Sequence, residues 1–350
     1  MKEALALLIN DIHVSKDNIA EFNRNWDEAL MVCQCEGISE IIIGGDMFTE
    51  RSSQTLAVLL AVKGALDRAV AKGMYVTIAE GNHDIVDKEA FDGYNHLWVG
   101  QKNIDVIDTY RILSWEECDF VLAVMSYFPE NGSFLDWLDK MLTEALTKHG
   151  DVVRSEQDII LYIHEGVHGA LGNFEIEGEL PQEPLLDYKA VLCGHYHNRI
   201  HIKGTNIQYI GSSRQHNFGE DEEKGYTILY TDGSTEFVKN QANQRFKTFD
   251  IDYDDISKID KLIDKETLEY CKVRVKVRCT EQQAKVFDKQ QLLDLGANKV
   301  ELTLNTSVVQ ETAAMGIEEK FDKQGIKKEY RNFCNEQEID SELGIKYLEG

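Results

Sequence analysis

Short apolar runs alternate with longer amphipathic stretches over the first 240 residues or so. The apolar runs span residues 4–9, 41–43, 75–79, 120–125, 159–163, 190–192, 207–210 and 226–230. Runs of this length, bounded by turn residues, predict β-strands. Residues 18–36 and 55–72 instead carry apolar side chains at helical spacing, and Gly73 follows the second stretch as a helix stop. The pattern predicts an α/β layer fold in which crossover helices join the strands.

The pattern changes near residue 240. Residues 271–279 alternate strictly, so Val273, Val275 and Val277 face one side of a predicted strand. Four cations face the other side: Lys272, Arg274, Lys276 and Arg278. After residue 304 the chain becomes more polar, with apolar side chains again at helical spacing. We therefore expect a large domain in residues 1–240, a small α+β domain in residues 241–306 and a helical segment in residues 307–350.

Composition narrows the class of protein. The 350 residues are 43% hydrophobic, which is ordinary for globular proteins and excludes collagen-like and wholly disordered chains. Acidic residues outnumber basic ones by 62 to 37, a formal net charge of -25, and this argues against simple binding of polyanions. No apolar run approaches the roughly 18–20 residues of a membrane span, so we expect no membrane association.

The seven cysteines form no Cys-x-x-Cys pair and are scattered along the chain. Neither a disulfide framework nor a zinc knuckle is indicated, and reduced thiols suit a cytoplasmic protein. The N-terminus leads directly into the first apolar run without a signal-peptide cleavage site. We therefore expect a cytoplasmic location.

Residue types that commonly bind metal ions in proteins directly follow five of the predicted strands. In chain order they are Asp11 and His13, then Asp46, then Asn82, His83 and Asp84, then His164, and finally His195 and His197. Open α/β sheets place their ligands at the carboxyl ends of strands, so these side chains are expected to meet. A carboxylate can bridge two divalent ions while imidazoles and an amide oxygen complete each shell. The pattern predicts a two-metal site.

Each short motif alone has an ordinary structural explanation, because a single histidine after a strand is more often a hydrogen-bonded structural residue than a ligand. Five motifs in this order, all at strand ends, make chance an inadequate explanation. In an extended strand His195 and His197 would point to opposite sides, so a turn is required there, and Gly194 is expected to permit it.

These motifs resemble those of the calcineurin-like metallophosphoesterases, whose order is Asp-x-His, Gly-Asp, Gly-Asn-His-Asp, His and Gly-His-x-His. Within that superfamily the chain resembles the SbcD branch of DNA double-strand-break repair nucleases, through residues 45–48, 163–167, 209–212 and 223–226. The resemblance covers residues 1 to about 240. It implies a four-layer metallophosphoesterase sandwich of two mixed β-sheets flanked by helices, with a small α+β capping domain and a C-terminal helical segment.

The resemblance also implies the role of each candidate residue. Asp11, His13 and His197 are assigned to one divalent ion, Asn82, His164 and His195 to the other, and Asp46 bridges them. The branch favours Mn²⁺, with Mg²⁺ as the alternative. His83 would act on the phosphate, and Asp84 either orients His83 or caps a helix. In part of the branch a second histidine stands where this chain has Thr49.

Candidate DNA contacts come from two places. Under the resemblance, the cationic face formed by Lys272, Arg274, Lys276 and Arg278 would guide DNA, although charges on an edge strand also protect against aggregation. Arg199 and Arg214 follow the ligand-bearing segments and would contact a backbone phosphate or form surface salt bridges. The other histidines are interpreted as neighbouring or surface residues (His168, His201) or as ordinary ones (His96, His149, His216).

The sequence thus predicts a manganese-dependent DNA exonuclease and endonuclease subunit that hydrolyses phosphodiesters with two metal ions. The expected partners are DNA and an SbcC-type, SMC-like ATPase bound through residues 307–350, in a heterotetramer containing a homodimer of this chain. Its expected processes are DNA repair, recombination and replication in a bacterium or a phage-infected cell. One alternative is a phosphodiesterase or phosphatase acting on nucleotides or other small phosphoesters. Another is a metal-binding regulatory scaffold subunit, and the tail helices also have the alternative of packing on their own domain.

Overall fold

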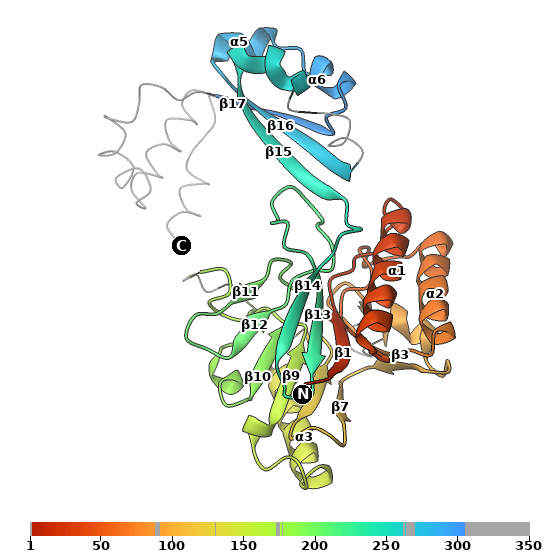
Figure 1. Ribbon diagram of the computed structural model, residues 1–350. Coiled ribbons are helices and arrows are strands. Elements are labelled where there is room, and N and C mark those ends of the chain that lie inside the picture. Colours follow the sequence, from red (N-terminus) through yellow and green to blue (C-terminus); the bar gives the residue numbers. More distant parts are fainter. Residues whose placement is uncertain are drawn as a thin grey trace, which may run out of the picture. The chain divides into compact units, whose positions relative to one another are not determined.

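The computed structural model of the chain describes residues 2–87, 92–129, 131–172, 176, 178–261, 263 and 270–304 (Figure 1). The described residues form two compact units, the first of residues 2–247 and 270–273 and the second of residues 248–261, 263 and 274–304. The first contains two six-stranded sheets and the second a three-stranded sheet. The predicted segment 307–350 lies outside the described residues.

The first sheet has the strand order β14-β13-β1-β2-β3-β6. Its parallel part consists of β1 (Ala4–Ile9), β2 (Glu40–Gly44), β3 (Tyr75–Ala79) and β6 (Ile104–Ile107). At the other edge, β13 (Gly225–Tyr230) runs antiparallel to β1 and pairs with β14 (Thr235–Lys239). Helices α1 (Ile19–Glu36) and α2 (Leu56–Ala71) connect the first three strands.

The second sheet has the order β11-β12-β10-β9-β8-β7. Its central strands are parallel: β8 (Val121–Met125), β9 (Ile159–Ile163), β10 (Ala190–Cys193) and β12 (Ile207–Tyr209). The edges β7 (Tyr110–Ser114) and β11 (Ile200–His201) are antiparallel, and helix α3 (Asn131–Lys148) packs beside this sheet. Both sheets are therefore mixed.

Three apolar cores separate four layers. Strand β2 shows how: Ile41 and Ile43 belong to the same core as Phe22 and Trp26 of α1, while Ile42 belongs to the core between the two sheets. A third core joins the second sheet to α3. Strands buried on both faces read as continuous apolar runs, which is why the sequence located them. The expected four-layer sandwich of two mixed sheets flanked by helices is confirmed.

Shorter elements complete the first unit. A small hairpin pairs β4 (Ile85–Asp87) with β5 (Asp92–Gly93), and 3₁₀ turns span Tyr94–Trp98, Glu156–Asp158 and Glu183–Leu185. Thr55 caps α2 by accepting a hydrogen bond from the Val58 amide, and Gly37 ends α1 in the left-handed region. Of the helices that the structure describes, none combines the length and the apolar character needed to span a membrane.

The second unit is a three-stranded sheet of β15 (Arg245–Asp252), β16 (Cys271–Cys279) and β17 (Lys299–Leu304). A 3₁₀ helix spans Tyr253–Lys261, and short helices α5 (Glu281–Val286) and α6 (Gln290–Asp294) join β16 to its parallel neighbour β17. Val273, Val275 and Val277 of β16 are fully buried, as their alternation predicts. The cations between them lie on the opposite face of the strand.

Those cations already have neighbours inside the sheet. Arg278 pairs with Asp252 at 2.9 Å, and Arg274 donates to Thr248 Oγ1 at 3.1 Å and lies 3.8 Å from Glu301. The Lys272 ammonium lies 5.0 Å from the centre of the Phe246 ring. A hydrogen bond from Lys299 lowers the pKa of Glu301, and the charges of Arg274 and then Lys276 add to that effect. The predicted contact of this face with DNA stays a prediction.

Candidate metal centre

The five motifs converge where their strands end. Asp11 and His13 follow β1, Asp46 follows β2 and His83 follows β3, and the second sheet contributes residues after β9 and β10. An open hollow of about 450 Å³ is lined by His13, Asp46, Asn82, His83, His195 and His197. Asp11 and His164 are fully buried and do not line the hollow, but both contact its lining: Asp11 lies 3.9 Å from His197 and His164 lies 3.4 Å from Asp46. The structure thus brings together all seven candidate metal ligands and His83.

Asp46 lies between two imidazoles. Its Oδ2 atom is 3.4 Å from His13 Nε2 and 3.4 Å from His164 Nε2. Such an arrangement suits a carboxylate shared between two ions, because imidazole nitrogens bind ions at about 2.0–2.1 Å and donor atoms of one shell therefore lie roughly 3 Å apart.

The remaining candidate ligands have comparable spacing. Asp11 Oδ1 is 3.9 Å from the Nε2 atoms of both His164 and His197, and His197 Nε2 is 3.2 Å from His13 Nε2. His195 Nδ1 lies 3.1 Å from Asn82 Oδ1. The side-chain atoms are therefore close enough to share ions without a large rearrangement.

Three imidazoles are oriented by hydrogen bonds at their outer nitrogen. His13 Nδ1 faces the Phe48 carbonyl at 3.2 Å, and His164 Nδ1 faces the Gly44 carbonyl at 2.8 Å. His197 Nδ1 faces Glu220 Oε1 at 2.9 Å. A carbonyl or carboxylate only accepts, so Nδ1 carries the hydrogen and each Nε2 lone pair is left for an ion.

The surroundings of the buried His164 Nε2 atom show whether a metal ion fits this site. His164 Nε2 is buried and has no hydrogen-bond partner among the described residues, although it faces two buried carboxylates, Asp11 and Asp46. Across proteins in general, buried polar atoms are nearly always paired. A lone pair directed at two carboxylates is the donor set of a divalent cation, so these residues fit metal ions.

Burial and neighbouring charges shift the pKa values of the candidate ligands in different directions. Burial, the largest single effect, lowers the pKa of His164, but Asp46, Asp11 and the Gly44 carbonyl outweigh it and raise that pKa to about 10. Burial raises the pKa of Asp46, yet His164 and His13 hold it well below its usual range. Burial dominates at His13 and His195 and lowers each pKa to about 4, so both are neutral near pH 7. A proton and a cation would therefore compete for Nε2 of His164 near pH 7.

The backbone around the site is strained. Left-handed φ values occur at Asp11 (51°), His13 (50°), Asp46 (55°) and His195 (89°). Gly81 is required for space, because a Cβ atom there would lie 2.2 Å from the amide nitrogen of Asp46. The motifs thus specify the backbone path as well as the ligands.

The turn between His195 and His197 differs from the expected one. The left-handed residue is His195 itself, whereas Gly194 has no positive φ. Gly194 is needed for a different reason, because a Cβ atom there would lie 2.8 Å from Nδ1 of His164. The glycine makes room for a buried imidazole and does not form the turn.

Asp84 does not orient His83, as one of the two sequence-based alternatives expected. His83 Nδ1 faces the Thr49 carbonyl at 2.7 Å, and Nε2 has no hydrogen-bond partner at the hollow within the described part of the chain. Asp84 is fully buried and accepts hydrogen bonds from the amides of Met47, Phe48 and Gly81, at 2.9 to 3.2 Å. Burial and the neighbouring Asp46 raise its pKa to about 7. Asp84 therefore joins the Asp46 and His83 loops, and it precedes strand β4 and does not cap a helix.

Thr49 takes a structural position where part of the resembled branch has histidine. Its carbonyl orients His83, and its hydroxyl donates to the His13 carbonyl at 2.7 Å. One residue thus links a candidate ligand to the candidate catalytic histidine.

Arg199 and Arg214 have internal roles, in place of the expected phosphate contacts or surface salt bridges. Arg214 is buried and donates from Nε to the Ile12 carbonyl and from Nη2 to the His13 carbonyl, both at 3.0 Å, with Glu21 at 3.5 Å from Nη1. Arg199 Nη1 donates to Ile210 O and Thr227 Oγ1, and the guanidinium lies 4.2 Å from the Phe237 ring centre. Both hold loops of the site.

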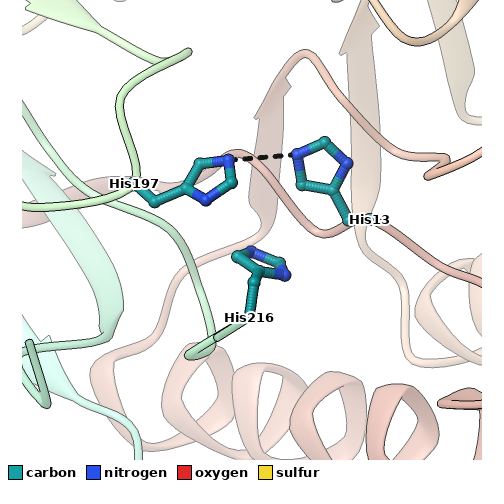
Figure 2. Close-up of side chains that lie close together, drawn as sticks. All are labelled: His13, His197 and His216. Carbon is teal, nitrogen blue, oxygen red and sulfur yellow. Dashed lines mark hydrogen bonds between the residues drawn. The ribbon is translucent and has the colours of Figure 1, made fainter. Parts of the chain in front are cut away.

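Two residues that sequence reasoning missed lie beside the candidate ligands. The ring of His216, interpreted from sequence as ordinary, is 4.5 Å from that of His197 and 4.9 Å from that of His13, centre to centre (Figure 2). Glu220 is the residue that orients His197. Both follow β12, a sixth strand end, and their distance from it in sequence hid the signal.

The sequence pattern of the calcineurin-like phosphoesterases matches residues 5–199. That span is more than half of the 350 residues and includes all five strand ends. The chain belongs to the calcineurin-like phosphoesterase family. It is a phosphoesterase with the α/β metallophosphoesterase fold, and its candidate metal-binding residues are histidines and aspartates.

Two viral proteins are similar to this calcineurin-like phosphoesterase. Protein 078R of Invertebrate iridescent virus 3, which has a phosphoesterase name, is 23% identical over 250 residues, or 71% of this chain and 68% of its own. Protein 244L of Invertebrate iridescent virus 6, named likewise, is 27% identical over 238 residues, or 65% of this chain and 77% of its own.

Solved structures with similarity include two enzymes. The nuclease MPE of Pseudomonas putida aligns with 67% of this chain and 87% of its own, at 17% identity and a TM-score of 0.31. A dimetal phosphatase from Danio rerio aligns with 65% of this chain and 92% of its own, at 12% identity and a TM-score of 0.40.

Binding of Mn²⁺ at pH 7 is expected to release a proton. His164, with a pKa of about 10 in the metal-free protein, must lose its proton before Nε2 can bind an ion. Affinity for Mn²⁺ should therefore rise as the pH increases from 7 toward 10. Calorimetric titrations in buffers of different ionisation enthalpy measure the proton count, with the exposed-histidine variant His201→Ala as control. Mn²⁺ binding without proton release would contradict the assignment of His164.

Proposed function

We propose that this chain is a manganese-dependent DNA nuclease, the nuclease subunit of an SbcCD-type complex. It would hydrolyse phosphodiester bonds at two ions held by Asp11, His13, Asp46, Asn82, His164, His195 and His197. The observation that carries the proposal is the set of seven candidate ligands beside His83, whose Nε2 has no hydrogen-bond partner among the described residues at the open hollow. Mg²⁺ is the alternative metal.

The ions, when bound, would supply a hydroxide nucleophile near neutral pH and offset charge on the non-bridging phosphate oxygens. Protein groups must do the rest. Asp46 and Asp11 hold the cation pair, with Asp11 fixed by the amides and side chains around it, including donation from the Asn10 amide group and from the His195 amide at 3.2 Å. Asp46 in turn accepts from the His83 amide at 2.8 Å. The backbone amide of His83, the candidate general acid, therefore also holds the candidate bridging carboxylate of Asp46.

His83 would act on the leaving oxygen. The Thr49 carbonyl keeps hydrogen on Nδ1, so protonation of the imidazole places the second hydrogen on Nε2, at the hollow. As the bond between phosphorus and the leaving oxygen breaks, Nε2–H can donate its proton to that oxygen and return to the neutral ring. The attacking oxygen forms the new bond to phosphorus, so no covalent intermediate with the protein is required.

DNA as the substrate is supported by residues 45–48 and 163–167, which resemble the SbcD branch, and by one cation of the hollow. Arg51 lines the hollow, is exposed, and its guanidinium has neither a hydrogen bond nor an ion pair within the described ranges. Arg214 at the same hollow is fully used by backbone carbonyls and Glu21. Arg51, absent from the sequence prediction, is therefore the arginine of this hollow that we assign to a DNA phosphate, and it replaces Arg199 and Arg214 in that role.

Two other functions are separated by direct assays. A phosphodiesterase of small substrates would hydrolyse bis-p-nitrophenyl phosphate but leave linear duplex DNA intact. A regulatory scaffold would bind metal without hydrolysing either substrate, and the presence of all seven candidate ligands and His83 argues against it.

The His83→Ala variant should keep two bound Mn²⁺ ions and lose DNA cleavage. General acid catalysis typically contributes about 10²–10⁴-fold, so the cleavage rate should fall by that factor. Calorimetry measures the metal count and single-turnover cleavage of linear duplex DNA measures the rate. Wild-type cleavage by this variant would remove His83 from the mechanism, whereas loss of metal would give it a structural role.

The Arg51→Ala variant should weaken DNA binding with little change in the rate of the bound complex. Loss of one phosphate contact should reduce the slope of log affinity against log salt by about 0.9. Fluorescence anisotropy of labelled duplex DNA at several salt concentrations measures the slope. Arg24→Ala removes an exposed arginine of helix α1 that does not line the hollow and serves as the matched control. An unchanged slope would show that Arg51 does not contact phosphate.

Deletion of residues 310–350 should abolish binding of the ATPase partner and spare manganese-dependent cleavage. We propose this segment as the docking site because its apolar side chains recur at helical spacing, which suits helix-in-groove recognition. Co-purification of a coexpressed SbcC-type ATPase with each form of the chain measures binding. Equal recovery with both forms would exclude the segment as the docking site.

A further inference from the structure

A third imidazole borders the space between His13 and His197. One ring nitrogen from each of His13, His197 and His216 lies within 4.8 Å of the others. Figure 2 shows the three rings facing a common space, with His216 contributed by a different loop from the other two. The three atoms can therefore surround one ion.

His216 is oriented in the same way as His13 and His164, by a hydrogen bond from one ring nitrogen to a backbone carbonyl. Its Nε2 lies 2.9 Å from the Asp11 backbone carbonyl, which only accepts, so Nε2 carries the hydrogen and Nδ1 keeps its lone pair. No hydrogen bond to Nδ1 occurs within the part of the chain that the structure describes. His13 and His164 are likewise held by a backbone carbonyl through one nitrogen, and present the other. Backbone orientation of this kind is typical of metal-binding histidines.

The loop that carries His216 is tied to the candidate ligands at several points. Glu220 accepts from the His216 amide at 3.0 Å through Oε2 and faces His197 Nδ1 at 2.9 Å through Oε1. The Ser212 amide donates to the His197 carbonyl at 2.9 Å. A single carboxylate therefore fixes one candidate ligand and the backbone of the third imidazole together.

We propose that His216 is a further ligand of the ion assigned to Asp11, His13 and His197, and that it binds through Nδ1. The inference rests on the two-metal site of the proposed function and is independent of the substrate. His216 lies beyond residues 5–199, the span that matches the family pattern.

The added imidazole would change which metals this position accepts. With Asp46 as bridge, the ion would have two carboxylate oxygens and three imidazole nitrogens from the protein. Mg²⁺ prefers oxygen ligands and retains water, whereas Mn²⁺ and Zn²⁺ accept imidazole readily. His216 would therefore favour Mn²⁺ over Mg²⁺ at this position, and the second position, with one imidazole fewer, would discriminate less.

Metal titrations of the full-length, metal-free chain test the inference. Calorimetry would compare Mn²⁺ binding by the wild type, His216→Ala and His216→Gln, the last of which retains an N–H for the Asp11 carbonyl. His201→Ala removes an exposed histidine whose ring bonds only to the Thr205 carbonyl among the described residues. We expect one of two Mn²⁺ sites to weaken by at least about tenfold in both His216 variants, with the other unchanged. Mg²⁺ should then compete better at the weakened site.

A Zn²⁺-soaked crystal of the wild type gives a second measurement that does not depend on how the variants fold. The anomalous peak of one ion should lie about 2.0–2.1 Å from His216 Nδ1. Two Mn²⁺ sites of wild-type affinity in both variants, or an ion beyond bonding distance of Nδ1, would overturn the inference and leave the two-metal site intact. Failure of the wild type to bind any ion would instead overturn the two-metal function itself.

Discussion

Burial of two carboxylates, Asp11 and Asp46, is the constraint on which the rest of this structure depends. Their exposed fractions are 0% and 2%. Removing an ionised carboxylate from water costs several kcal/mol unless nearby charges and donors offset it. His164 and His13 approach Asp46 within 3.4 Å, and the amides of His83 and His195 donate to the two carboxylates. Each of these four neighbours follows a different strand, and the four strands belong to both sheets. The buried carboxylates are therefore stabilised only when both sheets are folded and their loops are in place.

The same constraint explains the strained backbone. Among described residues other than glycine, left-handed φ values occur at five positions, and four of these are candidate ligands: Asp11, His13, Asp46 and His195. Such a conformation costs about 1–3 kcal/mol each and persists only where the surroundings over-determine it. Here the Asp11 and His13 amides donate to the Gly45 and Asp46 carbonyls at 3.1 and 3.0 Å, joining the loops after β1 and β2. Arg214 fixes the first of these loops from beneath. The sheets therefore hold the ends of these loops in fixed positions, which stabilises the strained backbone conformations.

The features of the fold and the site that could be predicted from sequence are those that depend on residues close together in the chain. Strands such as 4–9 and 159–163 were predictable because burial on both faces leaves a continuous apolar run, and α1 because its apolar stripe has helical period. The ligands were predictable because each directly follows a strand. Helix α3 and the edge strands β7 and β14 were not identified, since their half-buried patterns are weaker.

The roles of other residues depended on contacts between distant segments. Arg214 bonds to carbonyls some two hundred positions earlier, and nothing in its local sequence distinguishes that role from a phosphate contact. His216 reaches the Asp11 carbonyl across a similar separation. Asp84 stands next to His83 in sequence, yet its carboxylate is directed at the amides of another loop. Adjacency in sequence therefore identified the site but assigned some partners within it incorrectly.

The net charge of -25 acquires a different meaning once the carboxylates are located. Composition alone argued against a polyanion as substrate, because dispersed acidic groups repel phosphate. Asp11 and Asp46, however, are directed at imidazoles inside the site, and two divalent ions would reverse the sign of the local charge where a phosphate must lie. Salt screens electrostatic interactions beyond about 8–10 Å, so bound ions would attract a phosphate only within the hollow. The other acidic side chains would still repel DNA that approaches the surface near them. In the proposed nuclease, DNA affinity would therefore be coupled to metal occupancy, and an unloaded chain would repel the substrate that the loaded one cleaves.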